Sequence, residues 1–81
     1  MMMEAPIEDQ FIYCCEQNDY EVLENCLDRN FDVNQVILVG GQTTTGLELA
    51  YRLGNTAVVR RLLRVPGIDI SSIYHSFFKA L

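Results

Sequence analysis

The side chains best suited to chemistry in this sequence are three cysteines and one histidine. Cys14, Cys15 and Cys26 supply the thiols, and His75 supplies the imidazole. A zinc site needs four ligands at a recognised spacing, and a nucleophilic thiol needs a positioned base. These four residues match no such pattern, so we expect buried structural thiols at Cys14 and Cys26, a more exposed Cys15, and no metal. A thiol or metal switch built on the three cysteines is the alternative.

Two aspartates and a glycine pair are further candidates for catalytic or ligand-binding sites. Asp32 and Asp69 offer paired carboxylates, but both occur in matching turn sequences, where such side chains accept hydrogen bonds from local backbone amides. Gly40-Gly41 is not a phosphate-binding loop, because no Gly-Lys-Ser/Thr sequence follows it. We therefore expect no catalytic residue, no cofactor and no enzymatic activity.

Composition predicts one small globular domain, residues 1–81. The chain is 49% hydrophobic and 21% charged, which is too apolar for intrinsic disorder. A net charge of −5 with scattered basic residues argues against nucleic-acid binding. No apolar run approaches the roughly 20 residues that a membrane span requires, and the N-terminus lacks the features of a secretory signal. The odd number of cysteines does not fit a secreted disulfide framework, so we expect a cytoplasmic or nuclear protein.

Apolar residues recur at helical spacing in four main stretches, which predict two helix pairs. The stretches run from Ile7 to about Glu16, from Val22 to Leu27, from Leu47 to Leu53 and from Val58 to Leu63. A fifth helical stretch is expected over Ile73, Phe77, Phe78 and Leu81.

The segment between the two helix pairs predicts a tight reversal of the chain. Val36–Val39 is apolar and β-branched, and Gly40-Gly41 gives access to positive φ. The four apolar residues either pack against their own hairpin or form an apolar patch that awaits a partner. We favour partial burial.

The two halves of the chain repeat each other. Asn18–Leu23 aligns with Gly54–Val59 and, with one residue added at Pro66, Phe31–Asn34 aligns with Ile68–Ser71. A period of this length is typical of stacked arrays, because one helix pair cannot enclose its own apolar face.

The repeated segments resemble the ankyrin repeat family. Thr45–Ala50 stands where that family has its Thr-Pro-Leu-His-x-Ala motif, and Gly54–Leu63 resembles the family's second helix. Gly67–Ser71 resembles the Gly-Ala-Asp-Val-Asn turn that ends a repeat, and Asp32–Asn34 keeps the last three residues of that turn.

This resemblance implies an all-α fold, a short ankyrin-like solenoid of helix-loop-helix repeats joined by β-hairpin loops. Residues 7–34 would form a divergent first repeat, 43–71 the best-matching second repeat, and 72–81 the start of a truncated repeat or a capping helix. Gly46 and Glu48 replace the Pro and the His of the motif. The hydrogen bond that this His makes between neighbouring repeats is therefore not expected.

Ankyrin-like arrays bind partners through their hairpin tips and the exposed end of each first helix. The resemblance thus implies a protein–protein interaction module, a scaffold or regulatory adaptor, whose partner is another protein and neither nucleic acid nor membrane. A truncated regulatory segment of a larger ankyrin-repeat enzyme or channel is an alternative, as is self-association through the apolar C-terminal end. By position in the motif, the predicted binding residues are Glu16, Gln17, Gln42, Thr44, Arg52 and Leu53.

Overall fold

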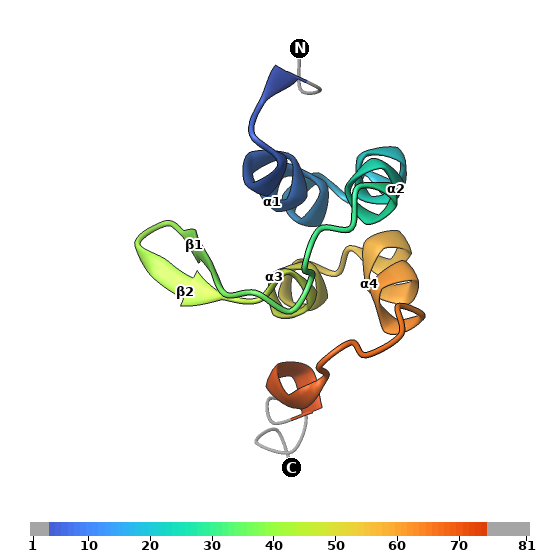
Figure 1. The fold of residues 1–81 in the computed structure, drawn as a ribbon. Coiled ribbons are helices and arrows are strands. Elements are labelled where there is room, and N and C mark those ends of the chain that lie inside the picture. Colours follow the sequence, from blue (N-terminus) through green and yellow to red (C-terminus); the bar gives the residue numbers. More distant parts are fainter. Residues whose placement is uncertain (1–3, 75–81) are drawn as a thin grey trace.

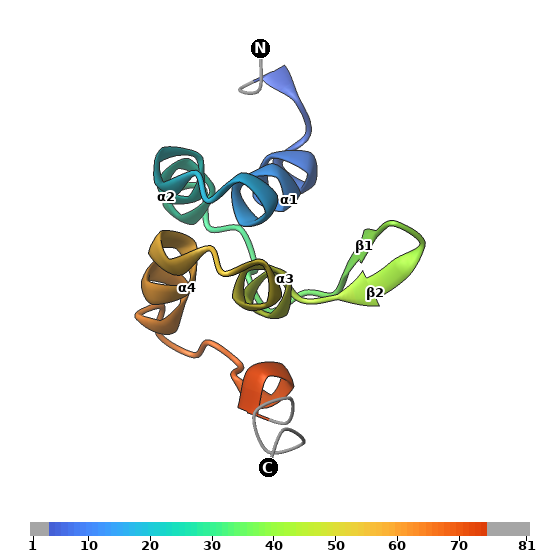
Figure 2. The ribbon, with the colours of Figure 1, turned by 180° about the vertical axis from the view of Figure 1, so that it is seen from behind.

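The computed structural model describes residues 4–74, which form two helix pairs with a β-hairpin between them. The elements are α1 (Ile7–Gln17), α2 (Tyr20–Asp28), β1 (Ile37–Val39), β2 (Gln42–Thr44), α3 (Gly46–Leu53) and α4 (Thr56–Leu63). The pair α3–α4 lies against the pair α1–α2, so that α1 faces α3 and α2 faces α4 (Figures 1 and 2). One more helical turn, residues 71–74, follows α4.

A two-stranded antiparallel sheet makes this fold a mixture of α and β structure. The prediction of an all-α, ankyrin-like solenoid is therefore wrong. Ile37 pairs with Thr44, and Gly40 and Gly41 form the two-residue turn with φ of 59° and 80°. Positive φ at both turn residues suits the right-handed twist of the strands, so the connector forms a paired ladder. The hairpin projects sideways from the helices (Figure 1).

Local side-chain bonds set where the helices begin and end. Asn18 ends α1 in the left-handed conformation, with φ of 58°, and Gly54 does the same for α3 with φ of 73°. The side chain of Asp19 then accepts a hydrogen bond at 3.1 Å from the amide three residues later, which starts α2. Thr45 caps α3 in the same way at 3.2 Å. Asp19 and Thr45 are therefore the N-caps of α2 and α3.

One apolar core runs through both helix pairs. The ring of Phe11 packs against that of Phe31, with centroids 4.7 Å apart. Because the core is shared, neither helix pair encloses its apolar face without the other. The buried apolar residues are Phe11, Cys14, Cys15, Leu23, Cys26, Val33, Ile37, Leu47, Leu49, Ala50, Val58 and Leu62.

Two asparagines exchange hydrogen bonds between the helix pairs. The Nδ2 of Asn55 donates to the carbonyl oxygens of Cys15 and Glu16 at 2.7 and 3.1 Å. In return, the Oδ1 of Asn18 accepts a bond from the amide of Val58 at 3.1 Å. Asn55 precedes α4 but makes no side-chain cap bond to it, so the first pair supplies the cap that α4 lacks.

Two more polar contacts join the helix pairs. The Nδ2 of Asn34 donates to the carbonyl of Gly67 at 2.9 Å, while its Oδ1 accepts from the amide of Asp69 at 2.8 Å. On the helices, the guanidinium of Arg61 in α4 pairs with the carboxylate of Glu24 in α2, and this hydrogen bond raises the pKa of Arg61. These contacts fix the position of the second helix pair relative to the first, both at the turns and along the helices.

The last predicted helical stretch is only partly described. The turn at residues 71–74 contains Ile73, which packs against the core. Phe77, Phe78 and Leu81 lie outside the described residues, as does His75.

Gly46 marks the closest approach of α3 to α1. A Cβ atom placed there would lie 2.4 Å from two ring carbons of Phe11 and 2.9 Å from the Sγ of Cys15. Because both neighbours are fully buried, neither can move without disturbing the core.

We therefore expect Gly46→Ala to destabilise the protein, although alanine is the better helix former. Overpacking of this kind costs about 1–3 kcal/mol, and urea denaturation followed by circular dichroism measures the loss. A second variant that joins Gly46→Ala with Phe11→Leu removes the clashing ring carbons and should lose less than the two single changes added together. An unchanged unfolding midpoint for Gly46→Ala would contradict the close packing.

Candidate binding surface

Four of the predicted binding residues lie along one edge of the molecule. Glu16 and Gln17 occupy the last turn of α1, and Arg52 and Leu53 occupy the last turn of α3. All four side chains are exposed, Leu53 to 54%. The bonds from Asn55 to the end of α1 hold these two helix ends side by side. We call Glu16, Gln17, Arg52 and Leu53 the helix-end strip.

Part of the backbone beneath this strip is bonded within the protein, because the Nδ2 of Asn55 donates to the carbonyl oxygens of Cys15 and Glu16 at the end of α1. The Nε of Arg52 lies 3.9 Å from the Oε1 of Glu48, and the Arg52 side chain is 52% exposed. An exposed pair at that distance contributes little to stability, so Arg52 can exchange Glu48 for a partner's carboxylate at small cost.

The two predicted hairpin residues do not join this strip. Gln42 is exposed on β2, which precedes α3, whereas Arg52 lies at the opposite end of that helix. Eight helical residues separate such positions by about 12 Å. Thr44 is buried, and its hydroxyl donates within the protein, to the Thr45 carbonyl at 3.3 Å or to Glu48 at 3.2 Å. Thr44 therefore supports the start of α3.

Both interpretations of Val36–Val39 hold in part, because burial alternates along the strand. Ile37 is buried and Val39 is half-buried, whereas Val36 and Leu38 are 62% and 65% exposed. Successive strand residues point to opposite faces, so one face of the hairpin joins the core and the other is an exposed apolar surface.

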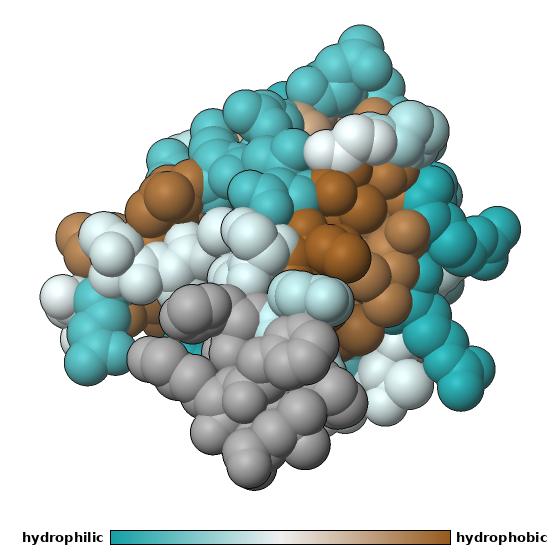
Figure 3. Space-filling model, turned by 90° about the horizontal axis from the view of Figure 1, so that it is seen from below, coloured by the Kyte–Doolittle hydropathy of each residue, from teal (hydrophilic) through white to brown (hydrophobic). Residues whose placement is uncertain are grey.

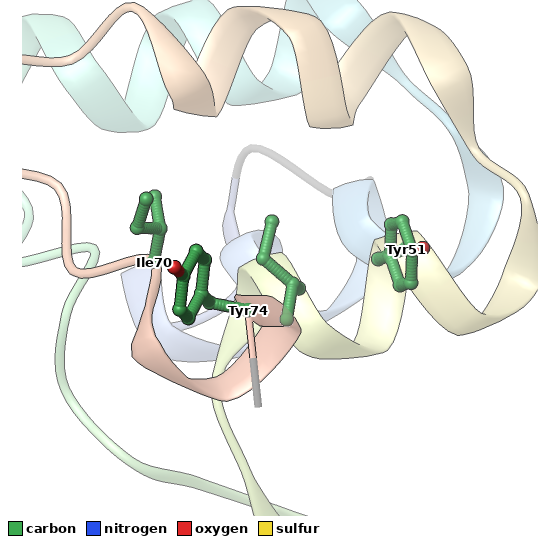
Figure 4. Close-up of a pocket in the computed structure, with 4 residues that line it drawn as sticks. Tyr51, Ile70 and Tyr74 are labelled. Carbon is green, nitrogen blue, oxygen red and sulfur yellow. The ribbon is translucent and has the colours of Figure 1, made fainter. Parts of the chain in front are cut away.

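The structure adds a surface that the sequence did not reveal. Tyr51 of α3 and Ile70, Ile73 and Tyr74 line an open cavity of about 330 Å³ (Figure 4). The turn at residues 71–74 is tied to α3 by a contact of 3.2 Å between the hydroxyls of Thr45 and Ser72. We call the apolar surface around this cavity the C-terminal face. The only signal for it in the sequence is the large Tyr51 at the position where the first half has Cys15.

The three thiols lie in the core and are poorly placed for chemistry. Cys14, Cys15 and Cys26 are fully buried, so the expectation that Cys15 is exposed is wrong. Because Gly46 has no side chain, α3 packs directly on the sulfur of Cys15. Hydrogen bonding with Cys15 and burial raise the pKa of Cys14 far above its ordinary value, and burial raises the pKa of Cys26 to about 11. Cys14 and Cys26 therefore stay protonated in the native state, and burial keeps all three thiols from reagents in solution.

The two aspartates act within their own turns, as predicted. Asp32 accepts a hydrogen bond from the amide of Asn34 at 3.0 Å, and Asp69 accepts one from the amide of Ser71 at 2.9 Å. The bond from Ser71 lowers the pKa of the Asp69 carboxyl. Among residues 4–74, no group of His, Cys, Asp and Glu is arranged to hold a metal ion, and no helix is long and apolar enough to span a membrane.

The chain matches no protein-family model, no curated protein and no solved structure. The case for a binding surface therefore rests on the geometry described above.

We expect the three thiols to resist a water-soluble disulfide reagent in the native protein and to react together once urea unfolds the chain. Burial keeps the reagent from all three thiols, and the raised pKa values of Cys14 and Cys26 keep those two thiols protonated. The rate is read from the release of the coloured thiol product, with a small free thiol as the reference. Rapid reaction of one thiol in the folded chain would revive the thiol-switch alternative.

Proposed function

We propose that this chain is a non-catalytic protein–protein interaction module, a scaffold or regulatory adaptor that acts in the cytoplasm or nucleus. Its membership of the ankyrin repeat family is part of the same proposal and rests on the sequence motifs. The observation that carries the binding role is the helix-end strip, in which the exposed ends of α1 and α3 are fixed next to each other.

The strip has the chemical variety that a protein interface uses. Glu16 offers a carboxylate, Gln17 an amide and Arg52 a guanidinium, while Leu53 adds an exposed apolar side chain. Binding energy at interfaces is concentrated in a few anchors, and arginine is enriched among them. Arg52 and Leu53 are therefore the anchors in this proposal, and Glu16 and Gln17 form a polar rim.

The fixed position of the helix-end strip supports the same function. Hydrogen bonds from Asn55 hold the backbone of Cys15 and Glu16 to the second helix pair, so the strip is in place before a partner arrives. A preorganised surface loses less conformational entropy on binding than a mobile one.

The test is affinity purification of the full chain from cell extract, followed by mass spectrometry. We expect the double variant Arg52→Ala, Leu53→Ala to retain roughly tenfold less of the captured partner than the wild type. The reason is that truncating an anchor side chain weakens the binding free energy by more than about 1 kcal/mol. The matched control is Arg60→Ala, Leu38→Ala, which removes an exposed arginine and an exposed leucine away from the strip.

Capture of no protein by the wild-type chain, or equal losses in the two double variants, would contradict the proposed role of the strip. Both variants must first show the circular dichroism spectrum of the wild type, so that loss of binding is not loss of folding.

A further inference from the structure

Helices α2 and α4 lie side by side on the side of the molecule away from the hairpin, and they run in the same direction (Figures 1 and 2). Just before α2, the side chain of Asn18 bonds the amide of Val58 in the first turn of α4. Beyond the ends of both helices, Asn34 bonds the carbonyl of Gly67. Start therefore lies beside start and end beside end, so equivalent residues of the repeat lie at the same level on the two helices.

The outer faces of these two helices carry opposite charges. Glu21 and Asp28 are exposed on α2, and Arg60 and Arg64 are exposed on α4. Residues four or seven positions apart share one side of a helix, so each pair forms a row. We call Glu21 and Asp28 the acidic row, and Arg60 and Arg64 the basic row. Seen from below, hydrophilic side chains project on the side of the molecule where α4 lies (Figure 3).

One ion pair already joins the two helices where their outer faces meet. Arg61 of α4 pairs with Glu24 of α2, and both side chains are partly buried. Glu24 first, and Tyr20 to a smaller extent, raise the pKa of Arg61, so Tyr20 lies beside this pair. Tyr20 is 46% exposed, which leaves an aromatic side chain at the surface between the acidic row and the basic row.

The charges of the two rows have no partner within the part of the chain that the structure describes. Neither an ion pair nor a side-chain hydrogen bond joins Glu21, Asp28, Arg60 or Arg64 to another described residue. In the repeat, Asp28 stands where α4 has Arg64, so these two opposite charges lie at the same level. A partner that matches this face must therefore be basic opposite α2 and acidic opposite α4.

The chain itself has the two rows that such a partner needs. In a dimer whose two-fold axis runs parallel to the helices, between α2 and α4, the acidic row of each copy lies over the basic row of the other. Because Asp28 and Arg64 lie at the same level, each carboxylate then faces a guanidinium on both sides of the axis. Another protein would need both rows, at the same spacing, to match this face equally well. The charges therefore favour a second copy.

The net charge of the chain opposes this contact only at long range. Each copy has a formal charge of −5, but residues 1–41 carry −8 and residues 42–81 carry +3. The dimer brings the acidic part of one copy onto the basic part of the other. Physiological salt screens charges farther apart than about 8 Å, whereas the opposed rows are in contact.

We propose that the outer face of α2 and α4 is a self-association surface, on which a second copy of this chain docks with its acidic row on the basic row of the first. The contact is isologous, so the assembly closes as a dimer. Tyr20 of each copy lies near the two-fold axis, and aromatic side chains of this kind are enriched in the centre of interfaces. The contact is small and its ion pairs are exposed, so the dimer is weak and forms at high concentration.

The test is a charge swap, read by sedimentation equilibrium of the full chain. We expect the mass of the wild type to rise with concentration to twice that of the chain. The double variant Glu21→Arg, Asp28→Arg makes both rows basic, and Arg60→Glu, Arg64→Glu makes both rows acidic. Each variant alone should need an at least about tenfold higher concentration for half-dimerisation, because like charges then face each other. An equal mixture of the two variants should dimerise again, since every acidic row then meets a basic row.

A control variant separates the two rows from the net charge. Glu8→Arg, Asp9→Arg changes two exposed acidic residues of α1, outside the proposed contact. Each of these substitutions adds two positive charges, so the control and Glu21→Arg, Asp28→Arg both change the net charge from −5 to −1. Both therefore weaken the general repulsion between copies equally, but only the variant in the acidic row should lose dimerisation.

A wild-type chain that stays monomeric at every concentration would overturn the proposal, as would equal weakening by the control or a mixture of the two swapped variants that stays monomeric. All variants must first show the circular dichroism spectrum of the wild type. The outcome is independent of the proposed function, since none of the changed residues belongs to the helix-end strip. Loss of dimerisation with unchanged partner capture, measured below the concentration of half-dimerisation, separates the two proposals.

Discussion

The fold depends on the hydrogen bonds that Asn18 and Asn55 make to the backbone of the opposite helix pair. Helices of eight to eleven residues are too short to be stable alone in water, so each must draw stability from its neighbours. Asn55 satisfies carbonyl groups at the end of α1, and Asn18 satisfies an amide at the start of α4. Each helix pair thus bonds backbone groups of the other. These bonds fix the relative position of the two pairs, and the apolar core packs between them.

The sequence predicts the local elements better than it predicts their assembly. The helical spacing of apolar residues indicates where the helices lie, and capping residues such as Asp19 and Thr45 mark where they begin. Both signals act within a few residues. The all-α class is wrong, because the expected hairpin between the helix pairs forms a paired two-stranded sheet, which makes the fold a mixture of α and β structure. Cys15 was expected to be exposed because its burial depends on Gly46, thirty-one positions away in the sequence.

For the candidate surfaces too, the sequence predicts what depends on nearby residues and misses what depends on residues far apart in the chain. The helix-end strip was predicted from motif positions, and its geometry is fixed by Asn55. Thr44 lies apart from this strip, because it is buried and its hydroxyl is used by Thr45 and Glu48 at the start of α3. The C-terminal face was missed because it forms only when the turn at residues 71–74 lies beside α3.

The most direct test of this account is the free energy of unfolding of the double variant Asn18→Gly, Asn55→Ala. Glycine keeps the left-handed conformation at position 18, where φ is 58°, so the change removes the side-chain bond without adding backbone strain. Three hydrogen bonds between the helix pairs are lost, and at about 1 kcal/mol each the account predicts a loss of about 3 kcal/mol in urea denaturation. A stability equal to that of the wild type would contradict the claim that these hydrogen bonds join the two pairs.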